Sequence, residues 1–418
     1  MIQGFYTGLS GIKTYQTAID VTSDNLANVN TVGFRSTTTE FANLYEKTLN
    51  MTTSPTTNTE DVGVGSRVNT ISMMQDYGSL ILTDKSTDLA IHDDGWFAIQ
   101  SNGEPLYTRA GNFTFDANSD LVTPDGFHVL GTMGGNIQDG VLTEKLSEVD
   151  LDAVDAQVPL NFPQTLTYPP EPTKTAKMIG NISVEDEVRT LGAGVVDPEG
   201  NRNNLQIKFK KKEEQIPPGS QWNAVVTIKS LDGNTIYSTV EEVVEFNEDG
   251  SLKNNPFTTI DNNGSPINID LGTGYDGVVS IANYDITSSS MADGTVGGDL
   301  VSYELNQNAE VIATFTNGVQ SSVGKVAVFH FQNDQGLERI SGTKFGKTSN
   351  SGEAIFFQDE NGKDVNGTKI SNYRLESSNT RVEVGLTDLI IMQRAFDANS
   401  KSITTADEMI QKALQMDA

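Results

Sequence analysis

The chain has 418 residues, of which 36% are hydrophobic and 20% charged, a composition typical of a folded protein with two or three domains. Its formal charge of −28 argues against binding nucleic acid, which requires clustered lysine and arginine. The absence of cysteine excludes disulfides, thiolate nucleophiles and cysteine-ligated metals. No apolar run reaches the roughly 18 residues of a membrane span, so no membrane insertion is expected. No cleaved leader is expected either, because no apolar core follows Met1.

Residues 1–34 begin the chain with apolar residues at a seven-residue spacing, which predicts an amphipathic helix. The apolar positions are Ile2, Phe5, Leu9, Ile12, Ile19 and Leu26. Gly4, Gly8 and Gly11 each cost roughly 1 kcal/mol relative to alanine in a helix, and helical spacing places them on one side, away from the apolar positions. We therefore expect a helix that is ordered only when neighbours pack on it, and whose glycines let another helix approach closely.

Residues 35–70 are rich in Thr, Ser and Asn with little periodicity and predict an extended connector. Mainly β-structure is expected after it. Residues 88–99 predict a β-hairpin around an Asp-Asp-Gly turn, and further short strands are expected through 105–131. Trp96 is expected to be a core or interface anchor, like Trp222 farther along the chain.

Two linkers are predicted to delimit a separate block in the middle of the chain. The first is the proline-rich stretch 168–172, and the second is the glycine-rich stretch 288–298. Residues 175–290 between them carry strand patterns at 204–210, 222–230, 235–246 and 267–271. We expect an outer β-rich domain at 175–290, inserted into an inner β-rich domain formed by residues 71–168 and 299–384.

The C-terminal segment repeats the seven-residue pattern and predicts a second helix, with Thr387 and Asp388 as its N-terminal cap and first turn. Its core positions are Leu389, Met392, Phe396, Asn399, Ile403, Ala406, Ile410 and Ala413. Matching patterns at the two ends predict an α+β fold in which residues 1–34 and 385–418 pair as a coiled coil. The alternative is two amphipathic helices that pack separately on a globular core.

No catalytic or metal-binding constellation stands out, so no enzyme activity and no cofactor are expected. His92, His128 and His330 lie far apart in the sequence and are expected to be partly exposed strand residues. Residues 116–120 begin like a calcium loop, but Leu121 and Phe127 replace its required Gly and Glu, which favours a polar turn.

Three separated sets of residues stand out along the chain as motifs. The first, at residues 23–34, includes Asn25, Asn28, Asn30, Gly33 and Phe34. The second consists of residues 89–97, 107–111 and 121–126, and the third of residues 375–379 and 393–409. The asparagines can bond nearby backbone at a helix end, and Gly33 permits a left-handed conformation there. Together the three motifs resemble those of the bacterial flagellar rod and hook proteins. One departure is Phe396-Asp397, where the family usually has Tyr-Gln.

The resemblance implies a structural subunit that stacks with its own copies into a hollow helical tube, outside the cell after flagellar export. Other axial proteins (the distal rod, the hook cap and the hook–filament junction) and the export apparatus are the implied partners. The block at 175–290 favours the hook, because rod proteins lack such a large insert; a distal rod subunit is the alternative. A secreted β-rich enzyme or adhesin acting on polysaccharide is a third, poorer hypothesis.

Overall fold

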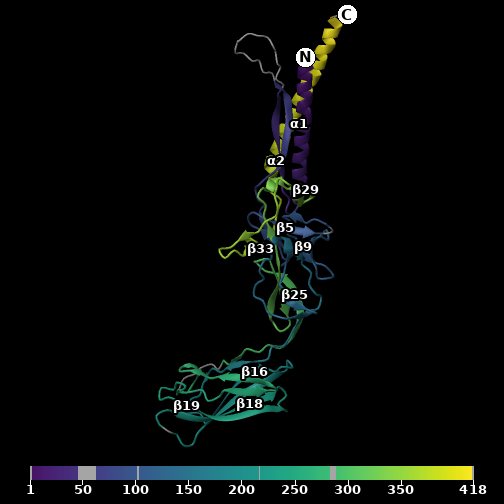
Figure 1. The fold of residues 1–418 in the computed structure, drawn as a ribbon. Coiled ribbons are helices and arrows are strands. Elements are labelled where there is room, and N and C mark those ends of the chain that lie inside the picture. The colour runs from purple at the N-terminus through teal and green to yellow at the C-terminus, as the bar shows by residue number, and fades with distance from the viewer. Residues whose placement is uncertain (1, 46–62, 101–102, 216, 283–288, 417–418) are drawn as a thin grey trace.

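The computed structural model describes residues 2–45, 63–100, 103–215, 217–282 and 289–416, which form an elongated molecule (Figure 1). Two long helices and a β-ribbon make up one end, a β-rich inner block lies in the middle, and a second, outer β-rich block forms the other end. The prediction of a mainly β protein with one helix at each end of the chain is therefore confirmed.

The two helices are α1 (Ile2–Ala27) and α2 (Val382–Met416), and they run antiparallel. At 1.5 Å per residue they are about 39 and about 52 Å long. The predicted start of the second helix is wrong, because α2 begins five residues before Thr387. The Thr387 hydroxyl instead bonds the Glu383 carbonyl one turn back (2.8 Å), inside the helix. Neither helix is long and apolar enough to cross a membrane over the residues that the structure describes.

A two-stranded antiparallel ribbon, β1 (Thr37–Tyr45) and β2 (Gly63–Met73), replaces much of the predicted extended connector. Residues 46–62 of that connector lie outside the described residues. The ribbon packs on α1 through backbone and hydroxyl groups. Ser66 donates its N–H to Ser10 Oγ (3.3 Å), and its carbonyl accepts from Thr14 Oγ1 (3.0 Å). The strand pairing comes from Thr and Val residues, which favour extended backbone.

The inner block is built from strands on both sides of the outer block. The strands that precede it in sequence are β3 (Leu80–Leu82), β4 (Leu89–Ile91), β5 (Trp96–Gln100), β6 (Leu106–Thr108), β7 (Thr114–Phe115), β8 (Leu121–Val122), β9 (His128–Met133), β10 (Ile137–Gln138), β11 (Val141–Leu142), β12 (Val158–Pro159) and β13 (Thr167–Tyr168). Those that follow it are β25 (Gly298–Leu305), β26 (Glu310–Phe315), β27 (Gln320–Val326), β28 (Val328–Phe329), β29 (Glu338–Ser341), β30 (Lys344–Gly346), β31 (Phe357–Gln358), β32 (Asp364–Val365), β33 (Ile370–Asn372) and β34 (Arg374–Glu376).

Fifteen of these strands form one sheet, whose main path is β10-β11-β13-β25-β26-β27-β9-β5-β6-β30-β29. Groups of strands from before and after the outer block therefore lie next to each other in the sheet, for example where β27 pairs with β9 through Lys325 and Thr132. The core beneath the sheet is apolar and aromatic, with Phe97 and Phe113 meeting edge to face at 5.1 Å between ring centroids.

The predicted hairpin at 88–99 is wrong, although both of its strands exist. β4 pairs with β33, while β5 pairs with β6, β9 and β28. The turn between β4 and β5 is opened by Arg109, whose Nη1 donates to the carbonyls of Asp93 (2.7 Å) and Gly95 (2.6 Å). The turn residues therefore accept hydrogen bonds from a distant side chain, and β4 and β5 pair with other strands instead of with each other.

The outer block contains β14 (Thr175–Lys177), β15 (Gly180–Asn181), β16 (Val188–Val196), β17 (Arg202–Lys211), β18 (Ser220–Ser230), β19 (Ile236–Phe246), β20 (Thr259–Asn262), β21 (Ser265–Asp270), β22 (Gly272–Thr273), β23 (Asp276–Val279) and β24 (Met291–Ala292). Its longest sheet has the order β16-β17-β18-β19, all antiparallel. Side chains alternate along β18, so that Trp222, Ala224, Val226 and Ile228 are fully buried. Both tryptophans are core residues, as expected.

Candidate assembly site

The glycine side of α1 is the side that contacts α2. A Cβ added at Gly8 would lie 2.8 Å from Ile403 Cγ1, and one added at Gly11 would lie 2.5 Å from Asn399 Oδ1. Farther along, Thr22 Oγ1 approaches Met392 Sδ at 3.6 Å. The two backbones can come this close because glycine has no side chain at the contact. At Gly4, by contrast, an added Cβ would meet nothing within 4 Å.

The predicted heptad positions are buried to different extents on the two helices. On α2, the half-buried positions are Leu389, Met392, Phe396, Asn399, Ile403 and Ile410; Ala406 is buried and Ala413 is exposed. On α1, Phe5, Leu9, Ile12, Ile19 and Leu26 are all only half-buried, whereas Gly8, Gly11, Ala18 and Thr22 are buried. Ile2 lies in α1, but its side chain is outside the described residues. Among the α1 heptad positions, Leu26 reaches α2, 3.1 Å from where a Gly385 Cβ would stand.

A second apolar surface of the helix pair has no partner within the described chain. On α2 the exposed large apolar side chains are Val382, Val384, Leu386, Ile390, Ile391, Met409 and Leu414. On α1, turning 100° per residue places Phe5, Leu9 and Ile12 about a quarter-turn from the glycines that face α2. Ile390 and Ile391 are both more than half exposed. At 100° per residue the exposed side chains of α2 lie on more than one side of that helix, so these side chains leave apolar surface uncovered around the helix pair. We call this set of residues the uncovered apolar stripe.

The first family motif connects α1 to the ribbon and to the inner block. Asn25 bonds both backbone groups of Thr37: its Nδ2 donates to the carbonyl (2.7 Å) and its Oδ1 accepts from the N–H (3.0 Å). Asn28 donates to the Asp24 carbonyl (2.9 Å), while Asn30 is exposed. These contacts replace helical hydrogen bonds where α1 ends.

Gly33 has the left-handed backbone expected of it, with φ +65°. It is also held against the inner block. A Cβ there would lie 2.4 Å from the backbone nitrogen of Ala110, and the Gly33 N–H donates to the Glu376 carbonyl (2.8 Å). Phe34 beside it is buried, with the Arg339 guanidinium 4.6 Å from its ring centroid. All three family motifs therefore meet at this point, which we call the motif junction (residues 33–36, 76–78, 109–111 and 376–379).

A buried ion pair forms the centre of the motif junction. Arg109 Nε donates to Glu376 Oε2 at 2.7 Å, and both side chains are at most 2% exposed. Glu376 Oε1 accepts from the Gly78 N–H (3.0 Å) and lies 3.5 Å from Arg35 Nη2. The Nη1 and Nη2 groups of Arg109 donate to backbone carbonyls, including that of Ile91, which accepts from Nη2 (3.2 Å). Such a pair adds modestly to stability while intact, but removing one partner leaves a buried charge unpaired.

Aromatic and amide groups complete the motif junction. The Tyr77 ring lies under both guanidiniums, 4.7 Å from Arg35 Cζ and 5.1 Å from Arg109 Cζ. Asn379 accepts from the Ser36 N–H (2.7 Å) and donates to the Asp76 carbonyl (2.8 Å), just before α2 begins. The motif junction thus ties the entry to α2 and the exit from α1 to one rigid part of the inner block.

An acidic pair lies beside the motif junction, in a cavity of about 440 Å³ whose wall also includes Arg35, Tyr77 and Trp96. A hydrogen bond with His330 lowers the pKa of Asp94 to about 2. Burial and the nearby Asp94 raise the pKa of Asp334 to about 7. The expected exposure of His330 is wrong: this ring is 1% exposed, 2.7 Å from the Asn366 carbonyl and 3.3 Å from Asp94.

The other polar features singled out in the sequence are structural. Asp116 Oδ1 accepts from the N–H groups of Asn118 (2.8 Å) and Asp120 (2.9 Å), the hydrogen bonding of a polar turn, as favoured. Over the described ranges, no group of three or more His, Cys, Asp or Glu side chains could hold a metal ion.

Sequence reasoning missed the ionic part of the motif junction. Arg109 and Glu376 lie inside quoted motifs, but Arg35, Asp76 and Tyr77 carry no periodic signal. The available clue was Arg109, a charged residue followed by Ala-Gly inside a strand-rich motif. If such an arginine is buried it needs an acidic partner, because buried arginine and glutamate are rare unless paired.

Comparison with known families finds three matches in the chain. Residues 5–35 match the family described as flagella basal body rod protein, residues 90–187 the flagellar hook protein FlgE/F/G D1 domain, and residues 371–416 the C-terminal part of the flagellar basal body rod FlgEFG proteins. The outer two matches contain most of α1 and all of α2, and all three matches contribute residues to the motif junction.

Two flagellar hook proteins are similar in sequence to this chain over nearly its whole length. The chain is 27% identical to the flagellar hook protein FlgE of Borreliella burgdorferi over 100% of both chains, and 26% identical to that of Salmonella typhimurium over 97% of this chain and 98% of the relative. The flagellar basal-body rod protein FlgG of Bacillus subtilis is 40% identical, but over only 33% of this chain and 54% of its own.

A solved structure shares the fold. The crystal structure of the Helicobacter pylori flagellar hook protein FlgE2 superposes with a TM-score of 0.54 at 17% identity, covering 71% of this chain and 100% of that one. The full-length agreement with hook proteins, against the partial agreement with a rod protein, separates the two alternatives that the sequence left open. The chain belongs to the flagellar hook protein family, as a structural subunit of the bacterial flagellar hook.

Proposed function

We propose that copies of this chain stack helically into a flexible hollow tube that joins the motor rod to the filament and transmits torque, and that it has no catalytic role. The observation that carries the proposal is the uncovered apolar stripe on the helix pair, with Ile390 52% and Ile391 58% exposed. Burying the exposed half of such side chains against neighbouring copies contributes on the order of 1 kcal/mol each, which favours assembly.

The proposed division of labour follows the three parts of the molecule. Residues 1–34 and 385–418 form the helical core domain, pair as a coiled coil and line the tube; 35–70 connect them outward. Residues 71–168 and 299–384 form the inner domain, and 175–290 form an outer domain inserted into it. Support comes from strand pairing: β13 meets β25 where Tyr168 pairs with Gly298, on either side of the outer block.

The motif junction has a mechanical role in this proposal. Torque passes between the helix pair and the β blocks, so the connection between them must resist bending. Two contacts cross this connection: the Gly33 N–H donates to the Glu376 carbonyl (2.8 Å), and Arg35 Nη2 lies 3.5 Å from Glu376 Oε1. Arg109 in turn holds the Glu376 side chain within the inner block, so these contacts favour one relative orientation. The distal rod, the hook cap, the hook–filament junction and the export apparatus are the proposed partners at the ends of the polymer and during export.

Substitutions on the uncovered apolar stripe test the proposal. Ile390→Asp and Ile391→Asp should leave a folded monomer, because these side chains contact little in the isolated chain, yet should prevent polymerisation. Thr405→Asp, at an exposed polar position on the same helix, is the matched control and should polymerise normally. Electron microscopy and sedimentation measure the polymers. Normal tubes from the isoleucine variants would contradict the role of the stripe.

A further inference from the structure

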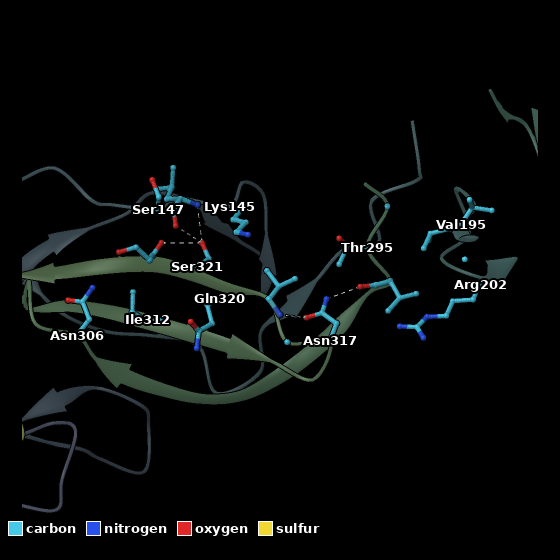
Figure 2. A pocket seen from close by; sticks show the side chains of 18 residues that line it. Lys145, Ser147, Val195, Arg202, Thr295, Asn306, Ile312, Asn317, Gln320 and Ser321 are labelled. Atoms are coloured by element: carbon cyan, nitrogen blue, oxygen red, sulfur yellow. Dashed lines mark hydrogen bonds between the residues drawn. The ribbon is translucent and has the colours of Figure 1, made fainter. Parts of the chain in front are cut away.

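A cleft of about 960 Å³ lies between the inner and outer blocks. Figure 2 shows side chains from several separate segments around it. The inner wall comes from residues 145–147 and 317–322, the floor from residues 294–296, and the outer wall from Val195, Val196 and Arg202. These segments are far apart in sequence, so the cleft exists only in the folded chain.

Hydrogen bonds hold the walls of the cleft in place. Ser321 Oγ accepts from the Leu146 N–H (3.0 Å), fixing the segment that carries Lys145. Asn317 Nδ2 donates to the Val296 carbonyl (2.7 Å), which fixes the floor; Figure 2 marks this bond. On the outer side, Thr173 Oγ1 accepts from the Val196 N–H (2.9 Å). The cleft is therefore a defined surface and not a gap between loosely placed loops.

The charge of the cleft is opposite to that of the molecule. The chain has 56 acidic and 28 basic residues, yet the residues that line this cleft include Lys145 and Arg202 and no acidic residue. The two cations come from opposite walls, and Figure 2 shows the Arg202 side chain extending from the outer wall towards Asn317. Within the part of the chain that the structure describes, neither side chain makes an ion pair or a hydrogen bond.

A buried hydroxyl adds an unused hydrogen-bonding group. Ser322 also lines the cleft, is 1% exposed, and its Oγ has no partner among the described residues. A buried hydroxyl without a partner is costly, and a small shift of this wall that opened the enclosed Oγ to a ligand oxygen would remove that cost. The ammonium of Lys145 and the guanidinium of Arg202 lie on separate walls, and each suits a carboxylate, so the cleft suits a segment that carries more than one carboxylate.

We propose that this cleft binds an exposed acidic segment of a second copy of the chain; the inference rests on the proposed self-assembly. A chain with a net charge of −28 repels its own copies, and a basic cleft facing an acidic surface reverses that repulsion locally. An acidic segment with one carboxylate at Lys145 and another at Arg202 would also tie the inner block of one copy to its own outer block. Assembly would then stiffen the connection between the two blocks.

Zero-length cross-linking tests the contact directly. Polymers are grown from an equal mixture of ¹⁵N-labelled and unlabelled full-length chain and treated with a carbodiimide, which joins a lysine to a carboxylate in contact with it. Mass spectrometry should find Lys145 joined to an Asp or Glu of another copy, in peptides of mixed label. Cross-links of Lys145 only within one chain, or none at all, would overturn the proposal.

Charge removal gives the second arm. The Lys145→Gln/Arg202→Gln variant should raise the critical concentration for polymerisation roughly 3–10-fold at low salt, with less effect at high salt, where charges are screened. The Lys208→Gln/Lys210→Gln variant removes the same charge from exposed positions on β17 and should match the wild type. Equal critical concentrations for the two variants would refute the proposed binding of a second copy in the cleft.

Two further outcomes separate the hypotheses. A wild-type chain that forms no polymer would overturn the proposed function and this inference with it, whereas wild-type polymers with an unaffected cleft variant would overturn the inference alone. Inorganic phosphate that abolished the difference between the variants at constant ionic strength would assign the cleft to a free anion instead.

Discussion

Adding one methyl group at Gly8 measures how closely the two helices pack. In the Gly8→Ala variant, the new Cβ would stand 2.8 Å from Ile403 Cγ1 and 3.3 Å from the Asn399 carbonyl oxygen. Both distances are shorter than a normal carbon contact, so the helices must separate slightly or Ile403 must change rotamer. Gly4→Ala adds the same methyl group to the same helix, where nothing lies within 4 Å.

The magnitude follows from two opposing effects. Glycine-to-alanine replacement stabilises a helix by about 1 kcal/mol, and this gain applies at both positions. Overpacking at Gly8 costs about 1–3 kcal/mol. Gly4→Ala should therefore stabilise the helix pair by up to about 1 kcal/mol, reduced by fraying near the end of α1. Gly8→Ala should be neutral or destabilising by up to about 2 kcal/mol.

Urea unfolding of the monomer, followed by circular dichroism at 222 nm, measures the difference. The helical signal reports α1 and α2 because the remaining described structure is mainly β. Two variants with the same unfolding free energy would refute the close packing of the glycine side of α1 on α2. A more stable Gly8→Ala variant would refute it as well.

Three further substitutions test the motif junction. Glu376→Gln should destabilise the chain by about 3–5 kcal/mol in urea, because it leaves the Arg109 charge buried without a partner. Gly33→Ala should cost more than about 2 kcal/mol, since it combines a left-handed backbone with a Cβ 2.4 Å from the Ala110 nitrogen. Asp334 has a pKa raised to about 7 from 3.8, so the folded state binds the extra proton and stability falls as pH rises from about 4 to 7. Asp334→Asn should flatten that part of the stability–pH curve, by an amount on the order of 1–2 kcal/mol after allowing for solvent screening.

Each of these substitutions has a control with the same chemistry. Glu360→Gln changes an exposed glutamate and should be neutral. Gly126→Ala has a similar φ, +79°, but open space around it, so it isolates the backbone strain from the clash at Gly33. Asp20→Asn changes an exposed carboxyl and should leave the slope against pH unchanged. Indistinguishable results between a junction variant and its control would remove the structural argument for that residue.

The predicted β-strands of the outer block lie close to the observed ones, for a physical reason. Residues 204–210 alternate polar and apolar side chains, residues 222–230 do so except at Val225, and residues 235–246 are rich in β-branched and aromatic residues. Each segment falls within or nearly on β17, β18 or β19. A strand with one buried and one exposed face must alternate in this way, so the local pattern carries the whole signal. The hairpin at 88–99 failed because its turn residues are used by Arg109, 14 to 16 positions away in sequence.

At the motif junction, too, the local sequence pattern predicts backbone conformation but not long-range contacts. Gly33 could be assigned a left-handed backbone from the sequence, because a glycine after a helix commonly adopts one. That the same glycine lies against Ala110, and that Arg109 pairs with Glu376 across 267 positions, follows from long-range contacts that no local spacing encodes. Apart from the Ala-Gly that follows Arg109, the positions of the charged residues in the motifs gave no indication that they were buried.

The sequence by itself determined that both ends of the chain form long amphipathic helices, that the middle is β-structure, and that three motifs resemble the hook family. Apolar periodicity and turn residues act over a few positions and can be read without the fold. Only the tertiary structure decided which side of α1 meets α2. Apolar spacing favoured Phe5, Leu9 and Ile12, but the side chains that allow the closest approach are the absent ones of Gly8 and Gly11, and the apolar stripe stays partly uncovered for other copies.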